Sequence, residues 1–375
     1  MVKADPNEIQ RKLFKWLQTT RYASTALDFV SANSSNFVFR AHLSDPLEDG
    51  TAVVIIKHDS NPPKSTENPE PLSSTVEKDC FRALQSFRTV CEQETFKCTV
   101  ETPQYFYFDD ETKTHILECL PNGINLKNYA LQNLLPPSTD AARPQFYCLG
   151  KCLAEYITAF HRFAMEENQK PLYETLKQHQ AMQDLKHMIN YDWLLQRIEQ
   201  WPHILEEARG IFQEVKTEAL KELEGKSTSL VPIHGDFWTG NILLPNTPVQ
   251  GVNELSVLVI DWEMAHLGVP AMDHGEIIGE LYALWLYRRI DAGLWMIQGY
   301  ADGLGEQTES SAWRIALQVG SHLLSFGTIA PGWGTPEQVE EVALRGRDIV
   351  VHSWKKDRRW LENTELACLL PRSTS

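Results

Sequence analysis

Two short motifs built around acidic and amide side chains constrain this chain most strongly. The first, His-Gly-Asp-Phe-Trp-Thr-Gly-Asn, spans residues 234–241 and follows a short apolar run. The second, Val-Leu-Val-Ile-Asp-Trp-Glu, spans residues 257–263, and its apolar run ends abruptly in a carboxylate. Asp236 and Asn241 therefore lie in a loop after a strand, and Asp261 follows Asn241 by twenty residues.

The order and spacing of these side chains indicate phosphoryl transfer. Residues 242–244 and 257–260 read as two short strands joined by a polar turn, so Asn241 and Asp261 should lie side by side at the end of a hairpin. Mg²⁺ binds few protein carboxylates and keeps waters and substrate phosphates as its other ligands. An aspartate that accepts the acceptor proton, here Asp236, completes the minimum set for transfer from a magnesium-bound nucleotide.

A lysine near the N-terminus fits the same chemistry. The continuous apolar strand 51–57 ends in Lys57, and a helix that begins near Thr75 carries Glu77 in its first turn. A rigid strand can deliver such an ammonium to nucleotide phosphates, as in the Val-Ala-Ile-Lys strand of kinases. Each residue alone has another interpretation. Lys57 can equally end a buried strand at the surface, and Glu77 can be a favourable charge at a helix N-terminus.

The remaining pattern predicts an α+β protein with a strand-rich first part and a helical second part. A helix at the N-terminus and a small sheet precede Pro121-Asn122-Gly123, and a Pro- and Ser-rich stretch at about 59–74 reads as a mobile insertion. We expect domains at 1–121 and 122–375. The predicted strands are 27–30, 37–43, 51–57, 105–108 and 115–120, and the predicted helical regions are 145–165, 190–224, 275–330 and 342–361.

Composition narrows the possible partners. The 375 residues carry a formal net charge of −15, which argues against binding to nucleic acid. No apolar run approaches the roughly 20 residues that a membrane span needs. Seven cysteines without a Cys-x-x-Cys pair, and a charged N-terminus, indicate a reducing compartment. We expect a cytoplasmic enzyme with no membrane partner.

These motifs together resemble the aminoglycoside phosphotransferase/choline kinase-like family of small-molecule kinases. The resemblance rests on His-Gly-Asp-x-x-x-x-Asn at 234–241, Ile-Asp-Trp-Glu at 260–263 and Gly-x-Pro-x-x-Asp at 268–273, and motifs extend from about residue 31 to 273. In this family the aspartate at the position of Asp273 braces the catalytic loop. The sequence around Asp273 is most similar to that of fungal members.

The resemblance implies a protein-kinase-like fold with two lobes, a small antiparallel sheet and a mainly helical C-lobe, that holds Mg²⁺ and ATP or GTP. By that match Lys57 grips the α- and β-phosphates and pairs with Glu77. The backbone near Glu118 and Leu120 receives the adenine. The loop 31–36 lacks the glycines of protein kinases, so Ser34 and Ser35 are expected to contact the phosphates instead.

The sequence leaves the identity of the acceptor substrate open. Trp238, Trp262 and Glu263 adjoin the two motifs and are candidates to contact a small molecule with a hydroxyl group, such as a cationic amine or a sugar. The main alternative is a pseudokinase-type binding or scaffold protein without turnover, which would not need Lys57, Asp236, Asn241 and Asp261 together. A metal-dependent hydrolase would leave Lys57 unexplained.

Overall fold

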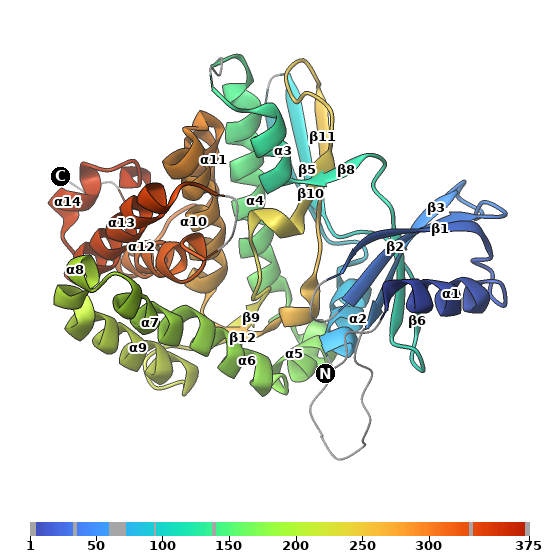
Figure 1. Cartoon of the computed structure of the whole chain (residues 1–375), viewed down its shortest axis with the longest axis horizontal. Coiled ribbons are helices and arrows are strands. Elements are labelled where there is room, and N and C mark those ends of the chain that lie inside the picture. Colours follow the sequence, from blue (N-terminus) through green and yellow to red (C-terminus); the bar gives the residue numbers. More distant parts are fainter. Residues whose placement is uncertain are drawn as a thin grey trace.

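The molecule combines a β-rich N-terminal part, on the right of Figure 1, with a helical C-terminal part on the left. This arrangement confirms the predicted α+β, protein-kinase-like architecture. The computed structural model describes residues 5–32, 36–59, 73–93, 95–136, 140–329 and 333–371. Ser34, Ser35 and most of the predicted insertion at 59–74 lie outside these ranges.

An antiparallel sheet of five strands forms the N-terminal part, in the order β1-β2-β3-β7-β6. Side chains alternate between its faces. Val54 and Ile56 on β3 therefore pack on one face with the residues of α1, and Lys57 points to the opposite face, which α2 covers. The elements are α1 (Pro6–Leu17), β1 (Ser24–Ala32), β2 (Asn36–Leu43), β3 (Val53–Asp59), α2 (Ser73–Leu84), β6 (Tyr105–Asp109) and β7 (Thr114–Glu118).

A second sheet, in the order β4-β5-β11-β10-β8, joins the two parts of the chain. Three of its strands, β4 (Arg88–Gln93), β5 (Phe96–Glu101) and β8 (Gly123–Asn125), were not predicted from the sequence. The predicted hairpin of β10 (Ile242–Pro245) and β11 (Glu254–Val259) is present, and β11 pairs in parallel with β5. β8 pairs with β10. Because β5 precedes the proposed domain boundary at 121 and 122 and β11 follows it, the pairing of these two strands crosses that boundary. The short strands β9 (Val231–Ile233) and β12 (His266–Gly268) pair with each other, and β9 directly precedes the motif at 234–241.

Helices make up the C-terminal part, and α11 packs closely along α4. A Cβ atom on Gly299 would lie 1.9 Å from the carbonyl oxygen of Tyr147, so glycine is needed at this contact. The region predicted as two helices at 275–330 contains three, α10, α11 and α12. The helices are α3 (Leu126–Asn133), α4 (Arg143–Phe163), α5 (Lys170–Lys177), α6 (Gln180–His187), α7 (Trp193–Gln200), α8 (Pro202–Leu205), α9 (Arg209–Leu223), α10 (Pro270–Arg288), α11 (Asp291–Gly303), α12 (Glu309–His322), α13 (Pro336–Trp354) and α14 (Arg358–Glu362).

The helix α10 runs through the centre of the C-terminal part and is buried along most of its length. Its first turns nevertheless carry Asp273, His274, Glu276 and Glu280, which are all at most 5% exposed. Buried polar groups persist only where partners compensate for lost water, so α10 should organise a polar network. Within the described ranges, no helix has both the length and the apolar character that crossing a membrane requires.

The buried imidazole of His274 should make the protein sensitive to acid. Its Nδ1 lies 2.8 Å from the hydroxyl of Tyr300, and burial, together with the nearby His161, lowers the pKa of His274 to about 3. A group whose pKa is lower in the folded state stabilises the protein above its unfolded pKa, here about 6.5, and this stabilisation is lost as the pH falls toward 3. Between pH 7 and pH 5, His274 alone should lower the free energy of unfolding by about 2 kcal/mol.

The double variant His274→Phe/Tyr300→Phe replaces this pair by apolar rings and removes that titration. Its free energy of unfolding, measured with urea at pH 7 and pH 5, should fall less over this interval than that of the wild type. An equal fall in both proteins would show that His274 does not contribute to acid sensitivity.

Candidate active site

Lys57 lies at the centre of a buried cluster of three carboxylates. Its Nζ is 2.8 Å from Oε1 of Glu77 on α2 and 3.0 Å from Oε2 of Glu263, and it also contacts Oδ1 of Asp261. The Lys57 side chain is 9% exposed and that of Glu77 is 1% exposed. The structure thus brings together Lys57, Glu77 and Asp261, which are far apart in the sequence.

One ammonium does not balance this cluster. Burial would lower the pKa of Lys57, but Asp261, Glu77 and Glu263 outweigh it and raise the pKa well above its ordinary value. The lysine therefore stays charged. Burial raises the pKa of Glu77 and of Glu263, and the nearby Asp261 carboxylate raises both further, although Lys57 acts in the opposite direction. One ammonium is thus shared among three carboxylates. An added cation would relieve this excess of negative charge.

The motif at 234–241 is held by a carboxylate from α10. Oδ2 of Asp273 accepts the backbone N–H of His234 at 2.9 Å, and Oδ1 accepts that of Gly235 at 2.9 Å. His161, on α4, lies 2.9 Å from Oδ2 of the same aspartate. Asp273 therefore braces the loop, and His161 has the structural role that its position in a core helix suggests.

Gly235 is required by the backbone of this loop. Its φ is +79°, and a Cβ atom there would lie 2.4 Å from the carbonyl oxygen of Met264. Any side chain at this position would meet both an unfavourable backbone conformation and backbone atoms that cannot move aside. The arginine of the protein-kinase motif His-Arg-Asp has no room here.

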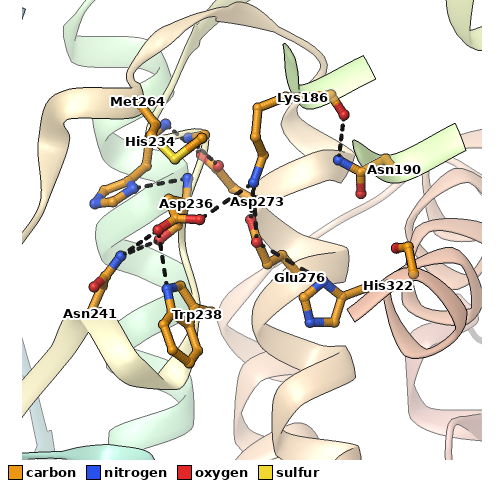
Figure 2. Close-up of polar contacts among 12 residues, drawn as sticks. Lys186, Asn190, His234, Asp236, Trp238, Asn241, Met264, Asp273, Glu276 and His322 are labelled. Atoms are coloured by element: carbon orange, nitrogen blue, oxygen red, sulfur yellow. Dashed lines mark hydrogen bonds and ion pairs between the residues drawn. The ribbon is translucent and has the colours of Figure 1, made fainter. Parts of the chain in front are cut away.

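Asp236 presents a hydrogen-bonded carboxylate at the end of this loop (Figure 2). Its Oδ2 accepts Nε1 of Trp238 at 3.1 Å and Nδ2 of Asn241 at 2.8 Å. Its Oδ1 lies 3.4 Å from Nζ of Lys186, and its side chain is 21% exposed. Since the amide nitrogen of Asn241 is used in this way, its amide oxygen is the atom suited to a cation.

Asn241 and Asp261 are placed next to each other by the β10–β11 pair. The backbone N–H of Ile260 donates to the carbonyl oxygen of Asn241 at 3.0 Å, and Nε2 of His234 lies 3.1 Å from the carbonyl oxygen of Ile260. Asp261 itself adopts a left-handed conformation, with φ 68°. Such strained residues cluster at functional sites, and here the turn directs the Asp261 carboxylate to Lys57.

The adenine contact predicted at Glu118 and Leu120 is partly used by the protein itself. The backbone N–H of Glu118 donates to the carbonyl oxygen of Gln104 at 2.8 Å, and the carbonyl oxygen of Leu120 accepts the N–H of Gly123 at 3.0 Å. The adenine contact stays a prediction, for the backbone groups between Glu118 and Leu120 that these two hydrogen bonds do not use.

Two of the predicted acceptor contacts need correction. Trp262 is fully buried, with its ring packed against Phe160 and His234, so it has no open face for a substrate. Glu263 contacts Lys57 and Asn36 and belongs to the carboxylate cluster. Only Trp238 remains beside Asp236.

Three polar residues near Asp236 were not singled out from the sequence. Lys186 on α6 contacts both Asp236 and Glu276, and Glu280 accepts the hydroxyl of Thr239 at 3.0 Å and lies 3.3 Å from His322. Glu276 and Glu280 follow Asp273 by three and seven residues, a helical spacing that could have placed them on its face. No local signal identifies Lys186.

Comparison with known proteins agrees with this geometry. Residues 98–312, more than half of the chain, match the family model APH, described as the phosphotransferase enzyme family. The chain belongs to this family. The phosphotransferase FrzJ of Cladobotryum sp. is 26% identical over 363 residues, which cover 93% of this chain and 92% of that protein. A 4-hydroxytryptamine kinase of Psilocybe cubensis is 21% identical over 318 residues, 82% of each chain.

A solved structure supports the fold. A choline kinase from Cryptosporidium parvum Iowa II superimposes with a TM-score of 0.50 at 14% identity, over 97% of this chain and 98% of that one. At this identity the likeness shows the fold alone. With the family match it confirms the resemblance predicted from the sequence, and the protein is a phosphotransferase.

The need for glycine at position 235 can be measured. Gly235→Ala should lower the free energy of unfolding by more than the roughly 1–2 kcal/mol that a left-handed backbone costs a residue with a side chain, because its Cβ also meets Met264. Gly225→Ala is the matched control, since Gly225 has φ +68° and open space around its Cβ position. Urea unfolding of both variants gives the comparison. Equal losses would show that the contact with Met264 is relieved at no cost.

Proposed function

We propose that this phosphotransferase moves the γ-phosphoryl group of ATP or GTP to a hydroxyl group of a small molecule, with Mg²⁺. The observation that carries the proposal is the position of Asn241. Its side chain bonds the carboxylate of Asp236, and its backbone bonds the residue before Asp261. Asn241 thus connects an acid–base group with the charged cluster around Lys57.

The donor set suits Mg²⁺. Asp261 supplies a carboxylate and Asn241 an amide oxygen, both ligand types that Mg²⁺ accepts while keeping waters and phosphate oxygens. The carboxylates of Asp261, Glu77 and Glu263 lie within 4.8 Å of one another, and Lys57 alone does not balance them. When bound, the metal would supply positive charge to the nucleotide phosphates. We assign Asn241 and Asp261 as its ligands.

The residues of the chain would divide the reaction between them. Lys57 holds the α- and β-phosphates, and Glu77 fixes the direction of the lysine side chain. The acceptor hydroxyl gives its proton to Asp236 as the hydroxyl oxygen forms a bond to the γ-phosphorus. The bond from that phosphorus to the β-phosphate oxygen breaks, and the nucleoside diphosphate leaves with the electron pair.

The surroundings of Asp236 limit the acceptor. Trp238 is partly exposed, and Nζ of Lys127 lies 5.7 Å from its ring centre and 3.9 Å from that of Trp333. Lys127 thus occupies the faces of these two aromatic rings that a cationic substrate would use. The nearby carboxylate of Glu276 is paired with Lys186. These contacts favour an acceptor that uses its hydroxyl and an apolar or aromatic body more than a separate ammonium site.

A screen for nucleotide consumption, with and without Mg²⁺, tests the proposal. The acceptors should include 4-hydroxytryptamine, the substrate in the name of two fungal relatives, together with choline, sugars and aminoglycosides. Magnesium-dependent turnover of one acceptor is expected. A protein that binds nucleotide but turns over none would favour a binding or scaffold role.

Asp236→Asn separates proton transfer from positioning. The amide can still hydrogen-bond an acceptor but does not take its proton. Turnover should fall by about 10²- to 10⁴-fold, the usual contribution of a general base, with nucleotide affinity nearly unchanged. The exposed Asp45→Asn is the control and should behave as the wild type. Near-wild-type turnover in Asp236→Asn would remove Asp236 as the base, and lost nucleotide affinity would assign it to the metal.

Asp261→Asn tests the metal site. Asparagine tolerates the left-handed backbone at this position, so the fold should persist. The rise in thermal midpoint that Mg²⁺ and nucleotide produce together, a measure of linked binding, should be largely lost.

Glu263→Gln is the matched control for Asp261→Asn, because it also removes one carboxylate from Lys57. It should keep the magnesium-dependent rise in midpoint. If both variants lose the rise equally, the effect comes from the charge around Lys57, and Asp261 is not a specific ligand.

A further inference from the structure

The two oxygens of the Asp236 carboxylate have different surroundings. Oδ2 accepts two hydrogen bonds of 2.8 and 3.1 Å, from Asn241 and Trp238. Among the described residues, the side-chain contact recorded for Oδ1 is the 3.4 Å approach of Lys186. A carboxylate oxygen offers about two acceptor positions, so Oδ1 has the capacity left for an acceptor hydroxyl. The ammonium of Lys186 would then lie beside the reacting oxygen.

Lys186 is fixed from the other side by Glu276. Its Nζ lies 3.2 and 3.5 Å from the two oxygens of that carboxylate, and the Lys186 side chain is only 2% exposed. The backbone is fixed as well, because the amide of Asn190 donates to the carbonyl oxygen of Lys186 at 2.8 Å. Figure 2 shows Lys186 between the two carboxylates, Asp236 on the loop and Glu276 on α10.

Burial of a lysine is costly unless it is paired. Burial would lower the pKa of Lys186, but Glu276 and Asp236 outweigh it and raise the pKa above its ordinary value. The lysine therefore stays positively charged. A structural ion pair would need only Glu276. The second contact, to the partly exposed Asp236, is the one that a purely structural role leaves unexplained.

We propose that Lys186 is a positioning residue for phosphoryl transfer, which holds Oδ1 of Asp236 toward the acceptor and is itself anchored by Glu276. The inference rests on the proposed role of Asp236. With Trp238 and Asn241 on Oδ2, the lysine on Oδ1 fixes the plane of the carboxylate. Its charge also offsets the repulsion between that carboxylate and the incoming phosphoryl group.

The test uses variants that separate positioning from folding. Lys186→Met alone leaves the Glu276 carboxylate buried without its partner, and its thermal midpoint should fall. Lys186→Met/Glu276→Gln removes both charges together and should recover most of that midpoint. With the best acceptor from the screen, kcat of the double variant should still fall at least 10-fold, while KM for the nucleotide stays within about twofold. The exposed Lys177→Met is the control and should change neither.

A cycle with Asp236→Asn shows whether Lys186 acts through Asp236. If it does, adding Lys186→Met/Glu276→Gln to Asp236→Asn should cause little further loss of kcat, because coupled residues are not additive. Lys186→Arg keeps the charge and should retain more turnover than the double variant.

Three results would overturn the proposal: wild-type kcat in the double variant, losses that multiply fully in the cycle, or equal losses in Lys186→Arg and the double variant. These outcomes differ from failure of the proposed function. In that case Asp236→Asn by itself would keep near-wild-type turnover.

Discussion

The site depends on the hydrogen bonds that the buried carboxylate of Asp273 accepts. This carboxylate is inaccessible to solvent, so its charge must be compensated within the protein. The backbone N–H groups of His234 and Gly235 and the imidazole of His161 supply the partners. Because these come from separate segments, one carboxylate fixes α4, α10 and the loop that carries Asp236 relative to one another.

The same helix extends this network beyond Asp273. Glu276 and Glu280 lie on the face of α10 that also carries Asp273. Lys186 from α6 forms an ion pair with Glu276, and Nε2 of His322 from α12 lies 3.3 Å from Glu280. Breaking one buried charge pair by removing a single partner is strongly destabilising. The helices around the site are therefore held in place by charge compensation as well as by apolar packing.

The charges around Lys57 are balanced differently. There three carboxylates share one ammonium, so negative charge exceeds positive charge. The charges around Asp236 and Glu276 are paired within the protein, whereas the cluster around Lys57 lacks a positive charge. This asymmetry agrees with the chemistry of phosphoryl transfer, in which a metal ion is brought to the site with the nucleotide.

The sequence by itself determined the fold class, the family and the pairing of β10 with β11, because each depends on local periodicity or on closely spaced motifs. It also predicted site residues at Lys57, Glu77, Asp236, Asn241 and Asp261. In the fold Lys57 contacts Glu77 and Asp261, and Asn241 contacts Asp236 and the residue before Asp261. The strands β4, β5 and β8 were missed. β5 pairs with β11 and β8 with β10, both far along the chain, and no local pattern reports such pairing. β4 pairs with β5 and was missed with it. Only the tertiary structure showed that Trp262 is core, that Glu263 faces Lys57 and that Lys186 reaches Asp236. Burial and long-range charge contacts arise when distant segments pack together, and the spacing of residues along the chain does not encode them.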